Sequence, residues 1–288
     1  MIEYRVEQTC AAKTIRQVAL GVCRVSRGAL SRLKFQEGIL LNGVPAHTDQ
    51  RVRTGDILTL VFREPVLPLP AASHMPLDVA YEDAALLVVI KPAPLPAISS
   101  RHQSGETLQN RVFSHLGAPR DFVYRPVNRL DKGTSGLMLI AKNAHIHQLM
   151  QRQLHSNALQ REYQGIIAGI LPQMKGTIAL PIGRGEGVKR CVSQSGRPSV
   201  THYEVIRAGE KTSLVQLQLE TGRTHQIRVH LEALGHPIVG DYLYGEEDTR
   251  LPGRFALHAA RLWFRHPLSG EEIVCASPVP QQLTELLL

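Results

Sequence analysis

The spacing of hydrophobic and polar positions divides the chain into two parts of unequal size. In residues 1–63, the segment after Thr14, a plausible N-cap, and the segment 26–36 both have the apolar spacing of short amphipathic helices. An Asn-Gly pair at 42–43 predicts a tight hairpin turn, and the apolar positions within 52–60 predict a strand. These elements predict a small α/β unit at the N-terminus.

A larger unit is predicted over residues 77–288, after a Pro-rich connector at residues 64–76. Proline cannot donate a hydrogen bond to a sheet and stiffens the chain, so the connector is expected to be a semi-rigid linker. In the larger unit, Thr107 and Asn143 precede helical patterns as N-caps, and the clean alternation at 214–220 predicts a half-buried strand. Helices and strands are therefore expected to be mixed in this unit.

Charge and cysteine usage narrow the class of partner. The 288 residues include 33 Lys and Arg against 25 Asp and Glu, a net charge of +8, which favours nucleic acid or an anionic membrane surface. The longest apolar stretch, residues 84–90, is far shorter than the ~20 residues that span a bilayer, and no signal peptide is visible. The four cysteines form no Cys-x-x-Cys pair. We therefore expect no membrane partner, no zinc site or disulfide framework, and a cytoplasmic location.

Three segments of the larger unit carry candidate chemistry. Residues 125–136 (Arg-Pro-Val-Asn-Arg-Leu-Asp-Lys-Gly-Thr-Ser-Gly) place the carboxylate of Asp131 on a turn just before a short apolar strand. Residues 161–163 (Arg-Glu-Tyr) begin another strand, and residues 221–230 (Thr-Gly-Arg-Thr-His-Gln-Ile-Arg-Val-His) follow a third. Taken alone, an Asp near Gly more often accepts backbone N–H bonds in a turn, and a strand tyrosine more often belongs to the core.

The sequence Arg-Leu-Asp-Lys-Gly-Thr-Ser-Gly-Leu, at residues 129–137, resembles the signature of the RluA-type pseudouridine synthases of large-subunit rRNA and tRNA. A strand ending in Lys-Pro-Ala at residues 91–93, the strand with Tyr163 and the segment around Arg228 resemble further motifs of this family, in the family's order. Asn128 stands where the family usually has His. The resemblance implies an α+β fold, in which the larger unit is a mixed, mainly antiparallel sheet flanked by helices and loops, with the active cleft across its middle.

The N-terminal unit resembles the S4 RNA-binding domain. A basic helix precedes Gly-Ile-Leu-Leu-Asn-Gly at residues 38–43, and Val-Arg-Thr-Gly-Asp follows at residues 52–56. The resemblance implies that Arg27, Arg32 and Lys34 of the basic helix contact RNA. The alternative is that they form the solvated face of an ordinary helix.

The resemblance implies an enzyme, an RNA pseudouridine synthase that isomerises specific uridines in structured rRNA or tRNA. Asp131 would act as a nucleophile or as the electrostatic partner of a cationic sugar, and Arg228 would keep it ionised and fix its direction. Arg129 would fill the stack vacated by a flipped nucleotide. Tyr163 would pack on the extruded base and is a candidate for moving the sugar proton. Further RNA contacts are expected from a group of polar residues, Asn128, Arg223, His225 and Gln226.

Two other functions remain open, and several features are not expected. The main alternative is a catalytically silent RNA-binding factor of the same fold that assists ribosome assembly or RNA folding. A hydrolase acting through Asp131 lacks the second carboxylate or metal cluster that such chemistry needs. No metal is expected at the C-terminal histidines, since they form no His-Glu-x-x-His motif, and no dinucleotide fingerprint suggests a nucleotide or other cofactor. A monomer is expected, and the basic, Gly-rich segment 181–201 is expected to be a mobile loop that could follow phosphates or be an ordinary connection.

Overall fold

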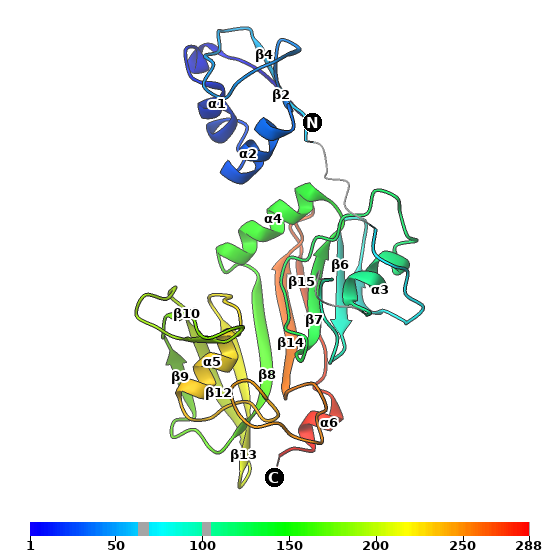
Figure 1. The fold of residues 1–288 in the computed structure, drawn as a ribbon, viewed down its shortest axis with the longest axis vertical. Coiled ribbons are helices and arrows are strands. Elements are labelled where there is room, and N and C mark those ends of the chain that lie inside the picture. Colours follow the sequence, from blue (N-terminus) through cyan, green and yellow to red (C-terminus); the bar gives the residue numbers. More distant parts are fainter. Residues whose placement is uncertain (63–68, 100–104, 288) are drawn as a thin grey trace. The chain divides into compact units, whose positions relative to one another are not determined.

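The computed structural model describes residues 1–62, 69–99 and 105–287, and the chain forms two compact units, Met1–Pro68 and Leu69–Leu288 (Figure 1). Residues 64–68 of the expected Pro-rich connector lie outside the described residues. The remainder of that connector, residues 69–76, contains no helix or strand. The hydrophobic clusters of the two units share no residue, which is the mark of separately packed domains.

The N-terminal unit is an antiparallel sheet with strand order β1-β4-β2-β3, packed against two short helices. Thr14 caps the first helix in a capping box with Gln17, as its position before an apolar-periodic segment predicts. Asn42 and Gly43 have φ values of +52° and +80°, which the predicted hairpin turn requires. The elements are β1 (Ile2–Arg5), the 3-10 helix η1 (Gln8–Cys10), α1 (Ile15–Gly21), α2 (Arg27–Phe35), β2 (Ile39–Leu41), β3 (Val44–Pro45) and β4 (Ile57–Leu60).

The C-terminal unit contains most of the strands and the remaining helices. Thr107 and Asn143 cap α3 and α4 through their side chains, so both predicted N-caps are confirmed. The elements are β5 (Asp78–Glu82), β6 (Leu86–Lys91), α3 (Leu108–His115), β7 (Ser135–Ala141), α4 (Ala144–His155), β8 (Gln160–Ala168), β9 (Lys175–Ile178), β10 (Ile182–Arg184), β11 (Arg190–Val192), β12 (Thr201–Ala208), β13 (Thr212–Leu219), α5 (Gln226–Ala233), β14 (Leu257–Arg265), β15 (Glu272–Ala276) and α6 (Gln281–Thr284).

One nine-stranded sheet organises this unit, in the order β5-β6-β7-β14-β8-β13-β12-β9, with β15 added beside β14. All its strand pairs are antiparallel except β7 and β14, which run parallel at Ser135 and His258. In Figure 1, β14 lies between β7 and β8, although it begins about ninety residues after β8 ends. The expectation of an α+β fold with a mixed, mainly antiparallel sheet is confirmed.

The two faces of the central strands supply two separate hydrophobic cores. Along β7, Met138 and Ile140 belong to the core that includes α3, whereas Leu137 and Leu139 belong to the core that includes α4. Because successive side chains of a strand point to opposite faces, β7 is buried on both sides. The turn that precedes β7, which carries Asp131, is therefore attached to the best-buried strand of the unit.

The basic segment 181–201 differs from its prediction as a mobile loop. Residues Ile182–Arg184 and Arg190–Val192 pair as an antiparallel hairpin, and Ile182 also exchanges backbone hydrogen bonds with Arg197. The side chain of Ile182 is buried, which anchors the hairpin to the unit. The prediction of a mobile loop is wrong for the paired residues, because glycine content says little about long-range backbone pairing.

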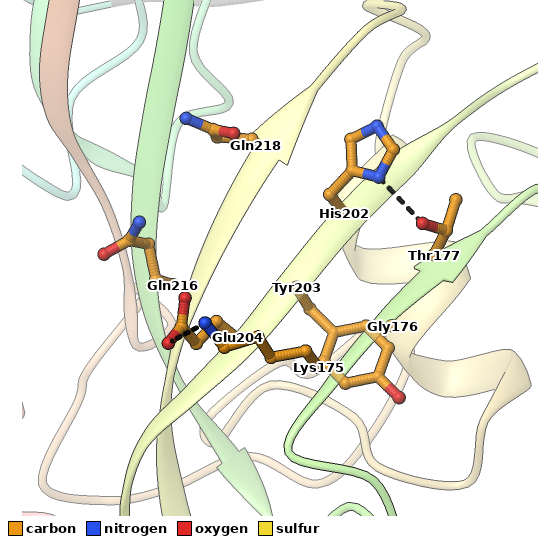
Figure 2. A pocket seen from close by; sticks show the side chains of 8 residues that line it. All are labelled: Lys175, Gly176, Thr177, His202, Tyr203, Glu204, Gln216 and Gln218. Atoms are coloured by element: carbon orange, nitrogen blue, oxygen red, sulfur yellow. Dashed lines mark hydrogen bonds and ion pairs between the residues drawn. The ribbon is translucent and has the colours of Figure 1, made fainter.

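The far end of the sheet presents a polar face over β9, β12 and β13 (Figure 2). Lys175 pairs with Glu204 at 2.8 Å between Nζ and Oε1, and Thr177 Oγ1 lies 2.8 Å from Nδ1 of His202. Two glutamines, Gln216 and Gln218, continue this face. The opposite charges pair with each other, so the face lacks the cationic excess that phosphate binding requires.

Candidate active site

The turn at residues 131–134 is held by short-range contacts that fix its backbone. The N–H of Thr134 donates to the carbonyl of Asp131 at 3.1 Å. Gly136, at the start of β7, has φ of +109°, and a Cβ there would collide with the backbone of Ala259 in β14. Only glycine combines that backbone conformation with such a close approach of two strands. The Gly-Thr-Ser-Gly sequence after the Asp therefore lets the turn that carries Asp131 sit directly against β14.

A buried lysine supports the same turn from beneath. The side chain of Lys91 is fully buried at the end of β6, and its Nζ lies 2.9 Å from the carbonyl of Pro92, 2.8 Å from that of Leu95 and 3.2 Å from that of Lys132. Burial lowers the pKa of Lys91 to about 7, although the charge of Asp131 acts in the opposite direction. Lys91 thus ties the Lys-Pro-Ala loop to the residue that follows Asp131.

The carboxylate of Asp131 faces the guanidinium of Arg228, which α5 supplies. Nη1 of Arg228 donates to Oδ2 of Asp131 at 3.1 Å. The other side of the same guanidinium is gripped by Asp241, whose two oxygens accept from Nε at 2.6 Å and from Nη2 at 2.7 Å. This bidentate pair is buried, with Arg228 at 3% and Asp241 at 0% exposure. It fixes the plane of the guanidinium, so the direction of the remaining nitrogen, Nη1, is fixed as well.

Aromatic rings and backbone groups complete the setting of Arg228. Its Cζ lies 4.2 Å from the ring centre of Phe255 and 4.9 Å from that of Tyr244, both within cation–π range. Asp241 also accepts the backbone N–H groups of Leu243 and Tyr244. Burial alone would lower the pKa of Arg228, but the hydrogen bonds and charges of Asp241 and Asp131 raise it. The guanidinium therefore remains a fixed cation beside Asp131.

His225 also approaches Oδ2 of Asp131. Its Nε2 is 3.9 Å from that oxygen, and its Nδ1 is 2.9 Å from the hydroxyl of Tyr244. The residue has φ of +59°, in the left-handed region, immediately before α5 begins. Burial lowers the pKa of the imidazole, while the charge of Asp131 tends to raise it. His225 is therefore close enough to influence the carboxylate, and its backbone conformation directs it there.

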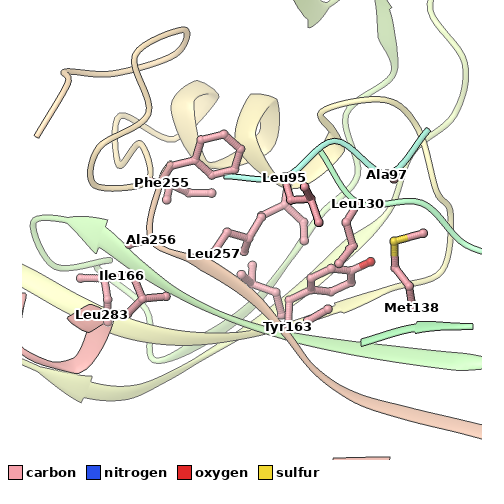
Figure 3. Close-up of a cluster of buried hydrophobic side chains, with 14 of the residues drawn as sticks. Leu95, Ala97, Leu130, Met138, Tyr163, Ile166, Phe255, Ala256, Leu257 and Leu283 are labelled. Atoms are coloured by element: carbon pink, nitrogen blue, oxygen red, sulfur yellow. The ribbon is translucent and has the colours of Figure 1, made fainter. Parts of the chain in front are cut away.

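A cleft joins these groups to Tyr163. Its lining includes Arg129, Asp131, Thr134, Tyr163, Arg223, His225, Gln226 and Arg228. Tyr163 is 5% exposed, and its ring packs with Leu130, Met138 and Leu257 of the hydrophobic core, as Figure 3 shows. Burial raises the pKa of the phenol, so the hydroxyl keeps its proton at neutral pH. Tyr163 is both a core residue and part of the cleft floor.

The residues expected to contact RNA occupy different settings. Arg129 is exposed at the cleft, and Arg223 is half-buried, with its guanidinium donating to the carbonyl of Pro198 at 3.4 Å. Gln226 is buried, and its amide bonds to Thr221, Arg223, Val200 and Thr201, so it shapes the loop before α5. The basic side chains of the N-terminal unit, Arg27, Arg32 and Lys34, are exposed on α2.

Asn128 departs from its expected role as an RNA contact. It is 3% exposed, its Oδ1 accepts the N–H of Leu139 at 2.8 Å, and its Nδ2 donates to the carbonyl of Leu137 at 3.3 Å. Both polar atoms are thus used to fasten the Asp131 segment to β7. Asn128 is therefore a structural anchor, and no RNA contact is supported there.

Two residues of the site, Asp241 and Tyr244, were not singled out from the sequence. The buried ion pair between Asp241 and Arg228, thirteen positions apart, has no local signature in the sequence. Each residue alone looks like an ordinary polar position. The one local signal is the Gly-Asp pair that follows His-Pro-Ile-Val at residues 236–239. The partners of Arg228 were therefore visible only through the fold.

Some histidines bond neutral groups, whereas His115, His202 and His266 pair with carboxylates. His230 contacts Thr201 and the carbonyl of Leu180, and His258 contacts Ser135 and Ser277. Within residues 1–62, 69–99 and 105–287, no group of three or more His, Cys, Asp or Glu side chains could hold a metal ion. Within the same ranges no helix is both long and apolar enough to cross a bilayer.

Comparison with known proteins gives one family throughout. The model of the RNA pseudouridylate synthase family matches residues 85–233. The chain is 37% identical to the uncharacterized RNA pseudouridine synthase YjbO of Bacillus subtilis, over 95% of this chain and 98% of the relative. It is 35% identical to the ribosomal large subunit pseudouridine synthase D of Vibrio cholerae, over 91% and 86%. The solved structure of human RNA pseudouridylate synthase domain containing 1 is similar, with a TM-score of 0.59 and 28% identity, over 73% of this chain and 86% of that one.

Proposed function

Because the chain belongs to the RNA pseudouridylate synthase family, we propose that Asp131 is the carboxylate with which it isomerises uridine in RNA to pseudouridine. The reaction breaks the bond between the sugar and a uracil nitrogen, turns the base and rejoins it through carbon, so it needs no oxidant or energy source. The observation that carries the proposal is the 3.1 Å contact between Oδ2 of Asp131 and Nη1 of Arg228, in a cleft floored by Tyr163.

Arg228 supports this role by holding one carboxylate oxygen and favouring its negative charge. The carboxylate can then act as a nucleophile toward the anomeric carbon or stabilise positive charge on the sugar as the base departs. In either case the benefit depends on orientation, since a group held in position before the reaction avoids the cost of ordering it. Asp241 supplies that rigidity by gripping the opposite edge of the guanidinium.

We propose that the target nucleotide enters the cleft flipped out of its stack. Extrusion costs a few kcal/mol, which contacts in the cleft and in the vacated stack must offset. Arg129, exposed beside Asp131, has the planar head that can replace a base in a stack. Tyr163 would pack against the extruded base, and its protonated hydroxyl is a candidate for moving the sugar proton.

The substrate we propose is structured RNA, either rRNA or tRNA, bound by a cytoplasmic monomer. The net charge of +8 supports binding of a polyanion, and the name of the Vibrio cholerae relative refers to the large ribosomal subunit. The N-terminal unit would act as an S4-like RNA-binding domain through Arg27, Arg32 and Lys34. Arg223, half-buried in the lining of the cleft, would contact RNA near the flipped nucleotide.

The test compares pseudouridine maps of total RNA from cells with and without the gene, complemented by wild type, Asp131→Asn or Asp121→Asn. Asp121 is an exposed carboxylate outside the cleft residues and serves as the matched control. One or a few sites should disappear in the deletion and return with wild type and Asp121→Asn but not with Asp131→Asn. If Asp131→Asn restores every site, Asp131 is not the catalytic group. If no site depends on the gene and the pure protein binds RNA without converting uridine, the silent RNA-binding alternative applies.

A further inference from the structure

A chain of contacts connects the β10–β11 hairpin to the carboxylate of Asp131. The backbone N–H of Arg190, in β11, donates to the hydroxyl oxygen of Tyr244 at 2.7 Å. That oxygen lies 2.9 Å from Nδ1 of His225, and Nε2 of His225 lies 3.9 Å from Oδ2 of Asp131. Three consecutive polar contacts therefore connect residues from four separate segments of the chain.

The hydrogen-bonding capacity of Tyr244 selects the tautomer of His225. A tyrosine hydroxyl carries one hydrogen, and here its oxygen already accepts the N–H of Arg190, so that hydrogen needs an acceptor. Nδ1 of His225 is the acceptor within reach. In a neutral imidazole the proton then resides on Nε2, the nitrogen that faces Asp131.

The charge of Asp131 selects the same tautomer independently. With the proton on Nε2, an N–H dipole points toward a carboxylate oxygen 3.9 Å away. With the proton on Nδ1, the lone pair of Nε2 would face that oxygen, which is repulsive, and the hydrogen of Tyr244 would lose its acceptor. Two separate contacts thus favour one protonation pattern.

We propose that His225, as its Nε2–H tautomer, is a positioning residue that holds Oδ2 of Asp131 jointly with Arg228. This rests on the proposed function, in which Asp131 reacts with the nucleotide. At 3.9 Å the contact is longer than a hydrogen bond, but such contacts in unliganded enzymes often tighten when the substrate binds. With Oδ2 contacted by both residues, Oδ1 is the atom left for the sugar, since no hydrogen bond reaches it from the described parts of the chain.

The backbone conformation of His225 suits this role. Left-handed φ is uncommon for a residue with a side chain, and His, Asn and Asp accept it more readily than most. It turns the chain sharply between β13 and α5, so the imidazole and Arg228 approach Asp131 from neighbouring positions. The hairpin that carries the exposed basic side chains Arg184 and Lys189 is bonded, through Arg190, to the residue that orients this imidazole. The hairpin is thereby linked to the orientation of Asp131.

Nitrogen NMR of the full chain labelled with ¹⁵N-histidine tests the tautomer without RNA. Wild type should show His225 protonated at Nε2 and bare at Nδ1, identified by the loss of its signals in His225→Asn. Asparagine tolerates the left-handed backbone, so this variant should fold. Tyr244→Phe keeps the ring over Arg228 but removes the hydroxyl, and should convert His225 to a mixture of tautomers. Tyr242→Phe, an exposed tyrosine two positions away, is the matched control and should change nothing.

Single-turnover conversion of a substrate RNA tests the catalytic consequence. His225→Asn and Tyr244→Phe should each lower the rate at saturating enzyme about tenfold with little change in RNA affinity, and the double variant should be no slower than the slower single one. A wild-type proton on Nδ1, or a double variant as slow as the product of the two single effects, overturns the proposal. If Asp131→Asn converts uridine normally, the proposed function fails instead, and this outcome is separate because the tautomer is measured without RNA.

Discussion

At the scale of single residues, the guanidinium of Arg228 is shared between two carboxylates that have different surroundings. Asp241 is completely buried and accepts four hydrogen bonds, two from Arg228 and two from backbone N–H groups. Asp131 is half-buried and accepts one hydrogen bond from the same guanidinium. The buried carboxylate therefore provides structure, while the accessible one keeps acceptor capacity for chemistry.

Asp241→Asn should weaken both stability and catalysis. A neutral amide can accept from only one side of the guanidinium, and removing one partner of a buried ion pair typically costs about 3–5 kcal/mol. Arg228 would also lose its fixed direction, so single-turnover conversion should fall by at least about tenfold. Urea denaturation and rapid-quench conversion measure the two effects. The control is Asp248→Asn: its partner Arg250 has a side chain that is 50% exposed, so losing this pair should change stability by less than about 1 kcal/mol. Equal effects of the two substitutions would contradict the prediction.

Lys91 should give the protein a specific pH dependence of stability. An unfolded lysine keeps its proton up to about pH 10.4, whereas the buried Lys91 has a pKa lowered to about 7. Between these values the unfolded state binds more protons, so this group makes folding more favourable as the pH rises, by at most about 1.4 kcal/mol per pH unit. Below about pH 7, Lys91 is charged in both the folded and the unfolded state, so it no longer makes the free energy of unfolding depend on pH.

Lys91→Met should remove that contribution. Between about pH 7 and about pH 8.5, the free energy of unfolding of wild type should rise by about 1–2 kcal/mol more than that of the variant, as measured by urea titration. The exposed lysine control, Lys211→Met, should keep the wild-type slope. Identical slopes for wild type and Lys91→Met would show that Lys91 stays charged in the folded protein, bonded to its three carbonyls.

At the scale of elements, the β10–β11 hairpin offers exposed cationic side chains beside the cleft residues. Arg184→Ala should weaken RNA binding and reduce the slope of log Kd against log salt by about 0.7–0.9 if the side chain neutralises one phosphate. Filter binding at several salt concentrations measures this slope. Val188→Ala, at an exposed position of the same hairpin, should leave the slope unchanged. An unaltered slope in Arg184→Ala would mean that this side chain does not contact phosphate.

Local signals predicted some elements well, and long-range pairing explains what they missed. Thr14, Thr107 and Asn143 were identifiable as caps because capping depends on residues within one helical turn. The hairpin at 182–192 was missed because its pairing is completed by contacts with two residues outside the hairpin, Arg197 and Tyr244. The parallel pairing of β7 with β14 likewise has no signature in either strand.

The candidate site was predictable to a similar extent. Asp131, Tyr163 and Arg228 were named from their motifs, and the structure brings all three to one cleft. The residues that orient Arg228 and His225 were not predictable. The ion pair of Asp241 with Arg228 and the contact of Tyr244 with His225 both depend on how the loop after α5 folds. Asn128 was assigned to RNA because a family position was assumed to face the substrate, whereas its burial shows that it anchors β7.

At the scale of the whole molecule, the separate cores predict that the C-terminal unit folds without the N-terminal one. A chain beginning at Leu69 keeps every cleft residue and both cores of its unit. It should unfold cooperatively and convert uridine, but with weaker RNA binding and a salt slope smaller by up to about 2–3, because α2 contributes three cations. Calorimetry and salt-dependent binding check both statements. A salt slope equal to that of the full chain would exclude α2 from the RNA interface.

The position of β14 has a consequence for the timing of synthesis. Because this late strand separates β7 from β8, the central sheet cannot close until residue 265 has left the translating ribosome. Arg228 and Asp241 are also translated long after Asp131, whereas the N-terminal unit is complete by residue 62 and can fold first. A nascent chain that binds RNA through α2, as proposed, could therefore not modify that RNA until β14, Arg228 and Asp241 have been translated.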